Sequence, residues 1–240
     1  MSTTIFQDGQ PTLPAAGVRG GRCPDELLAR YGEVLDGGRL NWTQYHNLGR
    51  RLGSGGQGVV FLTTRKGTDG FTLPVALKIF SPERYESEDR YSAAMQGIAR
   101  VSAQVAQIQQ DNLLDVQNFV EQRQIRIMEM EWIDGYDLSR LLAPDLLEKT
   151  RERVTASRWE YLNNVIVTPG SRQSRLKPGV AIAIVRECLA ALAALHRANI
   201  LHGDIKSSNI MVKRTGNAKI IDIGSAVTLE TAPSLSLIHI

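Results

Sequence analysis

The chain has 240 residues, of which 42% are hydrophobic and 22% charged, with a formal net charge of +3. This length and composition suffice for one globular domain with a sizeable core. So small a net charge gives no indication of a nucleic-acid partner. Cys23 and Cys188 lie far apart without metal-ligand spacing, which fits a reducing compartment better than a disulfide-stapled secreted domain.

Targeting signals are not evident in the sequence. The first thirty residues lack a basic start followed by an apolar run, so no signal peptide is predicted. No stretch of about 18 purely apolar residues occurs, and we therefore expect no membrane-spanning helix. With the cysteine usage, these features predict a cytoplasmic protein.

Residues 1–44 mix Gly, Pro, Thr and single charges without periodicity, and we expect a flexible N-terminal extension. From Tyr45 the pattern changes to short apolar runs bounded by turn formers. Three successive strands are predicted from the segments NLGRRL, VVFLTT and LPVALKIF.

A helix is predicted after these strands. Apolar residues recur at three- and four-residue steps between Tyr91 and Gln110, as on one face of an amphipathic helix. Two further strands are predicted at Leu113–Val120 and Gln124–Met130. Residues 45–133 should therefore form an α+β lobe, a small antiparallel sheet with one helix against it.

The region 134–234 has a different character. Residues 143–177 are polar and arginine-rich, and we interpret them as a solvated surface insertion rather than a dedicated anion site. The segment VAIAIVRECLAALAALH then predicts a long helix beginning near Pro178. This second region should be mostly helical.

A glycine-rich loop lies between the first two predicted strands. Residues 52–60, LGSGGQGVV, contain the pattern G-x-G-x-x-G-x-V, in which the backbone can close over a polyphosphate and direct N–H groups at it. A glycine-rich hairpin that binds no ligand would show the same sequence pattern. A dinucleotide-binding fold is excluded because a strand follows the loop where a helix is required. Lys78, in the strand VALKIF, would neutralise the phosphates.

Three polar side chains share a loop after the long helix. The segment LHGDIKSSNI holds Asp204, Lys206 and Asn209, which suit proton acceptance, charge neutralisation and metal binding. An Asx-type turn explains the loop but not the lysine. Asp222, at the end of the apolar segment KIID, supplies a second carboxylate for magnesium.

Taken together, these motifs resemble the protein kinase family, in its bacterial Ser/Thr form, over roughly residues 46–230. The resemblance implies a kinase fold, with the sheet-and-helix lobe followed by the beginning of a helical lobe. It also implies roles in catalysis. Asp204 would orient and deprotonate the acceptor hydroxyl, Lys206 would steady the γ-phosphoryl group, and Asn209 and Asp222 would bind Mg²⁺.

The same resemblance implies a site for ATP. The glycines would cover the phosphates, Lys78 would bind the α and β phosphates, and MEMEWIDGYDL would form the hinge beside the adenine. His202 would be a packing residue. The nucleotide-binding residues implied in this way are Leu52, Gly53, Gly55, Gly58, Val60, Ala76, Lys78, Met130, Glu131 to Ile133, Asp137, Met211 and Ile221.

Two departures from the family pattern stand out. The helix glutamate that pairs with the strand lysine is missing, because residues 91–110 contain no acid. Its substitutes would be sought among Glu86, Glu88, Asp89, Gln96 and Gln104. Gly203 replaces the arginine that usually precedes the catalytic aspartate, so control by phosphorylation of an activation loop is not expected.

We expect from these features an ATP- and Mg²⁺-dependent kinase acting on Ser or Thr hydroxyls of a protein substrate. Two alternatives remain: a pseudokinase that binds nucleotide or a partner without turnover, and a small-molecule kinase of the aminoglycoside or choline type. The H-G-D sequence favours the latter, whereas Lys206 argues for a protein kinase.

The end of the chain carries one further expectation. Because few residues follow Asp222, the chain is expected to be a fragment, inactive by itself, of a longer protein. Residues 235–240, LSLIHI, can be encoded by a string resembling a transposase mosaic-end sequencing adapter, and we interpret them as non-native.

Overall fold

The computed structural model describes residues 46–152, 154–168 and 174–229, together with Glu33. The chain divides into two compact units, 1–43 and 44–240, and the fold described below belongs to the second. The expected N-terminal extension and the expected adapter-derived tail lie outside the described residues, apart from Glu33, which is helical and exposed.

A five-stranded antiparallel sheet forms the first half of the fold, in the order β1-β2-β3-β5-β4. Its strands are β1 (His46–Gly55), β2 (Gly58–Lys66), β3 (Thr72–Phe80), β4 (Val116–Gln122) and β5 (Ile125–Glu131). The glycine-rich loop is the turn between β1 and β2, as predicted. Each predicted strand is present, with ends that differ by a few residues.

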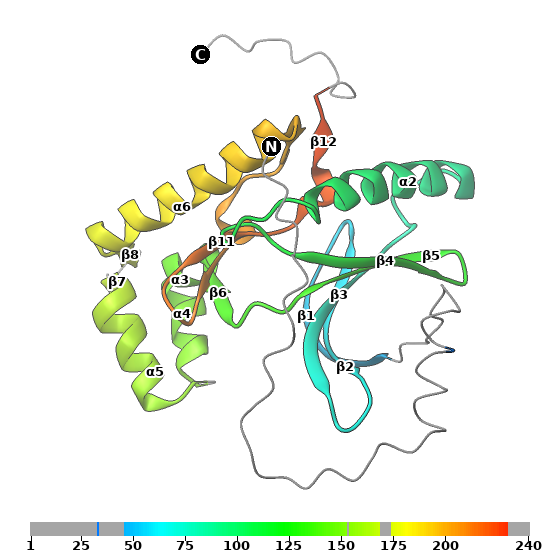
Figure 1. Ribbon diagram of the computed structural model, residues 1–240. Helices are drawn as coiled ribbons and strands as arrows, with labels where there is room; N and C mark the ends of the chain where they lie inside the picture. The colour runs from blue at the N-terminus through cyan, green and yellow to red at the C-terminus, as the bar shows by residue number, and fades with distance from the viewer. Residues whose placement is uncertain (1–32, 34–45, 153, 169–173, 230–240) are drawn as a thin grey trace, which may run out of the picture. The chain divides into compact units, whose positions relative to one another are not determined.

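One helix, α2 (Glu88–Val105), packs against this sheet. It begins before the predicted Tyr91 because Ser87 caps it by accepting a hydrogen bond from the backbone N–H of Arg90, and acidic residues in the first turn favour the positive end of the helix dipole. It also ends before the predicted Gln110. Figure 1 shows α2 lying across the sheet on the side of β4 and β5.

The main hydrophobic core lies between α2 and one face of the sheet. Met95 of α2 is 1% exposed and packs in one cluster with Phe80 and Met128. The cluster extends to Leu195 and Ile220 from the second half of the fold. The two halves therefore share a continuous core, which fixes their relative positions within this unit.

The second half contains α3 (Leu138–Leu142), α4 (Pro144–Arg151), α5 (Ala156–Tyr161) and α6 (Pro178–Arg197). Figure 1 shows α3, α4 and α5 below α6. This half also contains short strands before, between and after these helices: β6 (Gly135–Asp137), β7 (Val167–Thr168), β8 (Arg175–Leu176), β9 (Ile200–Leu201), β10 (Ile210–Lys213), β11 (Ala218–Ile220) and β12 (Val227–Thr228).

The polar stretch 143–177 contributes to the fold's interior. It forms α4, α5 and a π-helical turn at Leu162–Ile166. Leu147, Leu162, Ile166 and Val167 from this stretch are buried in a second cluster with Ile184 of α6. Charged residues separate Leu147 from Leu162 in the sequence, but both side chains belong to the same buried cluster.

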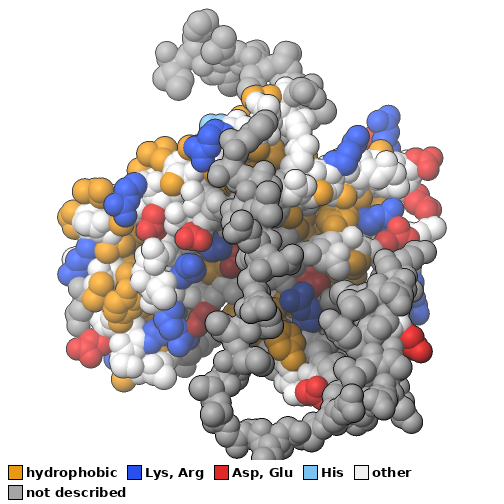
Figure 2. Space-filling model, viewed as in Figure 1, with side chains coloured by type: hydrophobic (Ala, Val, Ile, Leu, Met, Phe, Trp, Pro, Cys, Tyr) orange, Lys and Arg blue, Asp and Glu red, His pale blue; other side chains and the backbone are white. Residues whose placement is uncertain are grey.

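The helix predicted near Pro178 is α6, which starts with Pro178 and ends with basic residues in its last turn. By length and composition alone it is apolar enough to cross a membrane, although no membrane-spanning helix is predicted from the sequence. Ala191 and Leu195 nevertheless have no exposed surface and pack in the main core. Its opposite face, with Ile182, Val185 and Leu189, is exposed, and Figure 2 shows hydrophobic side chains at the surface in this region.

Candidate active site

Lys78 and Asp222 meet although they are 144 positions apart in the sequence. The Lys78 ammonium lies 2.5 Å from Asp222 Oδ1 and 2.6 Å from Gln57 Oε1. Lys78 is buried, whereas the Asp222 side chain keeps 31% of its surface exposed. Asp222 has left-handed backbone angles, and its Oδ1 also accepts the backbone N–H of Gly224. The strand lysine and the second carboxylate therefore form one charge pair.

A second cluster surrounds Asp204. Lys206 Nζ donates to Asp204 Oδ2 at 2.6 Å, and Asn209 Nδ2 donates to the same oxygen at 3.0 Å and to the backbone carbonyl of Asp204 at 2.8 Å. The hydrogen bond from Lys206 holds the pKa of Asp204 below its usual value. Asp204 is therefore a carboxylate at neutral pH, poised to accept a hydrogen bond from a hydroxyl.

His202 connects the two clusters. The backbone N–H of Asp204 donates to His202 Nδ1 at 3.3 Å, while His202 Nε2 lies 3.0 Å from the carbonyl oxygen of Ile221. A backbone N–H can only donate and a carbonyl can only accept, so the proton of the neutral ring is on Nε2. Burial lowers the pKa of His202, which favours this neutral form. The expected packing role of His202 agrees with this geometry.

The backbone adds a second connection between the same segments. The N–H of Ile221 donates to the carbonyl of Asn209 at 2.9 Å. Asn209 is buried, and its position is fixed by a short 3-10 turn, Ser207–Asn209. Asp204, Asn209 and Asp222 are therefore carried by two adjacent, mutually bonded segments.

Several residues predicted to surround the adenine lie on the same face of the sheet as Lys78. Val60 pairs directly with Lys78 across β2 and β3, and Ala76 pairs with Met130 across β3 and β5. Directly paired residues project to the same face of a sheet, so these four side chains share one face. Leu52 and Ile221 pack against the same core cluster. Met211 pairs with Asp137 across β10 and β6.

The hinge segment is held by an ion pair that the sequence did not reveal. Lys219 of β11 binds Glu131 Oε1 and donates to the carbonyl of Leu113 at 3.1 Å. Glu131 Oε1 also accepts the backbone N–H of Asp115 at 2.8 Å. The side chain of Glu131 thus connects the end of β5 to β11, while its backbone N–H donates to the carbonyl of Asp115 at 3.0 Å. The expected contact of the hinge backbone with a ligand stays a prediction.

The Asp137 carboxylate is bound by residues of its own helix cap. It caps α3 by accepting from the N–H of Arg140 at 3.0 Å, and it also contacts Ser139 and the Arg140 side chain. Its expected contact with a ribose stays a prediction.

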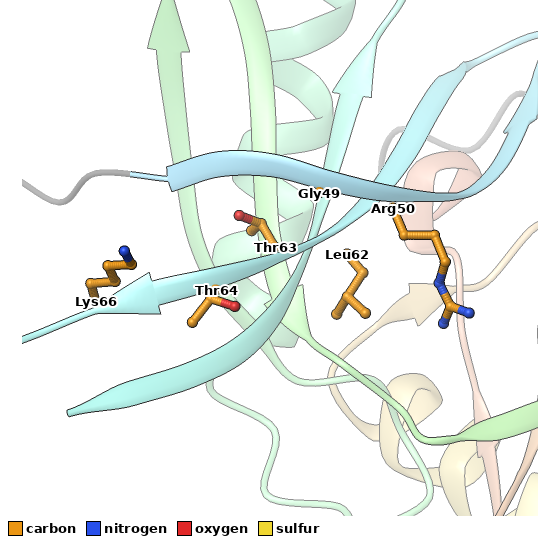
Figure 3. A pocket seen from close by; sticks show the side chains of 6 residues that line it. All are labelled: Gly49, Arg50, Leu62, Thr63, Thr64 and Lys66. Carbon is orange, nitrogen blue, oxygen red and sulfur yellow. The ribbon is translucent and has the colours of Figure 1, made fainter. Parts of the chain in front are cut away.

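A separate hollow lies on β1 and β2. Figure 3 shows Leu62 and Thr64 extending to one side of β2 and Thr63 to the other. The hollow has a volume of about 320 Å³ and is lined by Gly49, Arg50, Leu62, Thr63, Thr64 and Lys66. It contains none of the predicted site residues.

Comparison with known proteins gives the family. Residues 46–238 match the protein kinase domain. The chain belongs to the protein kinase family. It is 29% identical over 183 residues to the serine/threonine-protein kinase PknD of Mycobacterium tuberculosis, an alignment that covers 75% of this chain and 22% of PknD. It is 28% identical over 181 residues to PknE of Mycobacterium bovis, covering 75% and 26% of the two chains.

The fold of this kinase chain also resembles a solved structure. The PknI kinase domain of M. tuberculosis superposes with a TM-score of 0.52 at 21% identity, covering 77% of this chain and 60% of the chain in that kinase-domain structure. The kinase-like α+β fold predicted from the sequence is confirmed. The chain spans about a quarter of the length of the curated relatives.

Among the described residues, the hydrogen-bond partners of Lys78 are not those suggested as substitutes for the missing helix glutamate. Glu86, Glu88, Asp89, Gln96 and Gln104, the candidates proposed from the sequence, are all exposed. In the described part of the chain, the hydrogen bonds of the Lys78 ammonium go to Gln57 and Asp222. Gln57 lies at a variable position of the glycine-rich pattern, and no local signal in the sequence marks it as a partner of Lys78.

Proposed function

We propose that this chain carries the nucleotide-binding and catalytic residues for ATP- and Mg²⁺-dependent phosphoryl transfer to Ser or Thr hydroxyls of a protein. The observation that supports this best is the joining of Lys78–Asp222 to the Asp204 cluster through His202 and Ile221. A phosphate-binding cation, two candidate metal ligands and a proton acceptor are thereby held together. Phosphoryl transfer relies mainly on such positioning and charge stabilisation.

The acceptor hydroxyl would approach Asp204. The low pKa of this carboxylate makes it a hydrogen-bond acceptor that orients the hydroxyl oxygen toward the phosphoryl group. Lys206, now paired with Asp204 and 53% exposed, would offer its ammonium to the transferring group. Asn209 keeps the carboxylate in place by donating to it and to its backbone.

The donor groups also fit a magnesium ion. Asn209 uses its Nδ2 for Asp204, so its amide oxygen would be the atom that binds the metal. Asp222 uses Oδ1 for Lys78 and Gly224, which leaves Oδ2 for a metal. Oxygen ligands of this kind, few in number, suit Mg²⁺ bound with substrate phosphates. When bound, ATP would supply the transferable phosphoryl group, and Mg²⁺ would neutralise part of the phosphate charge.

We further propose that this part of the chain acts in the cytoplasm on a protein substrate. Cys188 is a free thiol, half-buried, and burial together with the neighbouring Glu187 raises its pKa. An unreactive, unpaired cysteine is compatible with a reducing compartment.

A pseudokinase that binds nucleotide without turnover is the second candidate. The observation favouring it is that α2 carries its acids, Glu88 and Asp89, only in the exposed first turn. If the Lys78–Asp222 pair alone cannot fix the phosphates, ATP would bind without productive geometry.

Mg-ATP binding and phosphate transfer, measured separately, distinguish the two candidates. Wild type should bind Mg-ATP saturably, and Lys78→Met and Asp222→Asn should both weaken binding. Asp204→Asn should leave binding nearly intact but abolish transfer to a generic protein substrate, because it removes the proton acceptor and keeps the phosphate contacts. Binding without any transfer by the wild-type full-length protein would favour the pseudokinase. Equal Mg-ATP affinity in wild type, Lys78→Met and Asp222→Asn would show that these residues do not form a nucleotide-binding site.

A further inference from the structure

The Gln57 side chain forms hydrogen bonds with two segments of the candidate site. Its carboxamide oxygen accepts from Lys78 Nζ at 2.6 Å, and its carboxamide nitrogen donates to Ser225 Oγ at 3.0 Å. Ser225 lies 168 positions away in the sequence, in the 3-10 turn that follows Asp222. One side chain of the glycine-rich loop thus contacts the strand lysine and the segment after the second carboxylate.

The backbone holds Gln57 in this position. Its carbonyl accepts the N–H of Ser81 at 3.0 Å, which joins the loop to the end of β3. The next residue, Gly58, has a φ of +139°, and a Cβ there would collide with the carbonyl of Ile79. The turn therefore packs closely against β3, the strand that carries Lys78.

The chemistry of a carboxamide suits both contacts. It accepts from the ammonium and donates to the hydroxyl without adding charge. A buried ammonium needs hydrogen-bond partners beyond a single carboxylate oxygen, and Lys78 obtains its second one from Gln57. The helix α2 offers no acid here, since its buried residues are Tyr91, Met95, Val101, Ser102 and Val105.

We infer that Gln57 is a positioning residue for Lys78, performing from the glycine-rich loop the task for which the resemblance expects a helix glutamate. This inference rests on the proposed function, since Lys78 is the proposed phosphate ligand. Gln57 holds the ammonium beside Asp222 and, through Ser225, couples the glycine-rich loop to the segment that carries Asp222.

The first test measures Mg-ATP affinity by calorimetry. Gln57→Leu should weaken binding about tenfold, the size expected when a hydrogen bond to a charged group is lost. Gln57→Glu, which keeps an acceptor for Lys78, should retain most of the affinity. In a Lys78→Met background, Gln57→Leu should cause no further loss, because the effect acts through Lys78. Unchanged or tighter binding by Gln57→Leu would overturn the inference, because Gln57 would then be neutral or compete with the phosphates.

The second test does not depend on nucleotide. Reductive methylation with ¹³C-formaldehyde labels accessible lysines, and the Lys78 signal is assigned by its absence in Lys78→Arg. Losing the Gln57 contact should make Lys78 methylate several times faster in Gln57→Leu than in wild type or Gln57→Glu. Gly56→Ala, whose added Cβ meets nothing within 4 Å, is the matched control for loop substitution and should label like wild type.

The two tests separate the failure of this inference from that of the proposed function. If wild type does not bind Mg-ATP, the proposed function fails, and the labelling rates alone decide whether Gln57 holds Lys78. Equal labelling of wild type and Gln57→Leu would overturn the inference whatever the nucleotide result. Faster labelling together with weakened, Lys78-dependent binding would support it.

Discussion

His202 Nε2 lies 3.0 Å from the carbonyl oxygen of Ile221, and this contact ties the loop of Asp204 to the segment after β11 that carries Asp222. The ring is buried, and its other nitrogen accepts the N–H of Asp204. Adding a proton to Nδ1 would break that second hydrogen bond and place a charge in the interior. The connection between the two clusters should therefore depend on pH.

The direction of this dependence follows from the lowered pKa of His202. As pH falls below the ordinary value of 6.5, the unfolded chain takes up the proton before the folded chain does. Stability present above pH 6.5 is thus lost as pH falls toward the folded-state pKa, with a slope of at most about 1.4 kcal/mol per pH unit. The lowered pKa of Asp204 changes the unfolding free energy only at pH values below the ordinary pKa of 3.8.

Urea unfolding at pH 7.5 and pH 5.5 checks this prediction. His202→Gln, which can both accept and donate, should lose less stability between the two pH values than wild type. His196→Gln, at an exposed position of α6, should behave like wild type. Equal pH dependence in all three proteins would contradict a neutral, buried His202.

Much of this arrangement was predictable because its signals are local. The glycine turn, the strand of Lys78 and the loop of Asp204 each depend on residues close together in the sequence. Gln57 and Ser225, or Lys219 and Glu131, come together only through the fold, so no spacing rule identifies them. The polar stretch 143–177 was harder to interpret, because its buried leucines are separated by charged residues in the sequence.

Gly58 provides a second prediction. Gly58→Ala should destabilise the fold by about 1–3 kcal/mol, because its positive φ and the carbonyl of Ile79 both oppose a side chain. It should also weaken Mg-ATP binding by displacing the loop. Urea unfolding and calorimetry measure the two effects. Gly56→Ala has open space and should change stability by less than about 1 kcal/mol; equal effects at both positions would refute the steric explanation.

The ion pair between Lys219 and Glu131 yields a third prediction. Lys219→Met should lower the unfolding free energy by about 1–3 kcal/mol, less than the ~3–5 kcal/mol for a fully buried pair, because the Glu131 side chain is 25% exposed. Adding Glu131→Gln should recover part of this loss by removing the unpaired charge. Arg214→Met breaks an exposed pair with Asp134 and should cost about 0–1 kcal/mol. Urea unfolding of wild type and these three variants would contradict this account if Arg214→Met cost as much as Lys219→Met.

The two faces of α6 give the last prediction. Leu195 has no exposed surface and packs in the main core, whereas Leu189 is 60% exposed on the same helix. Leu195→Ala should cost about 2–5 kcal/mol, because it leaves a cavity among side chains from both halves of the fold. Leu189→Ala should change stability by only about 0.5 kcal/mol in this chain. Both substitutions conserve helix propensity within a few tenths of a kcal/mol, so the difference in urea unfolding reports burial. A loss at Leu189 comparable to that at Leu195 would mean that the exposed face of α6 is covered in solution, and its dependence on protein concentration would tell whether a second copy covers it.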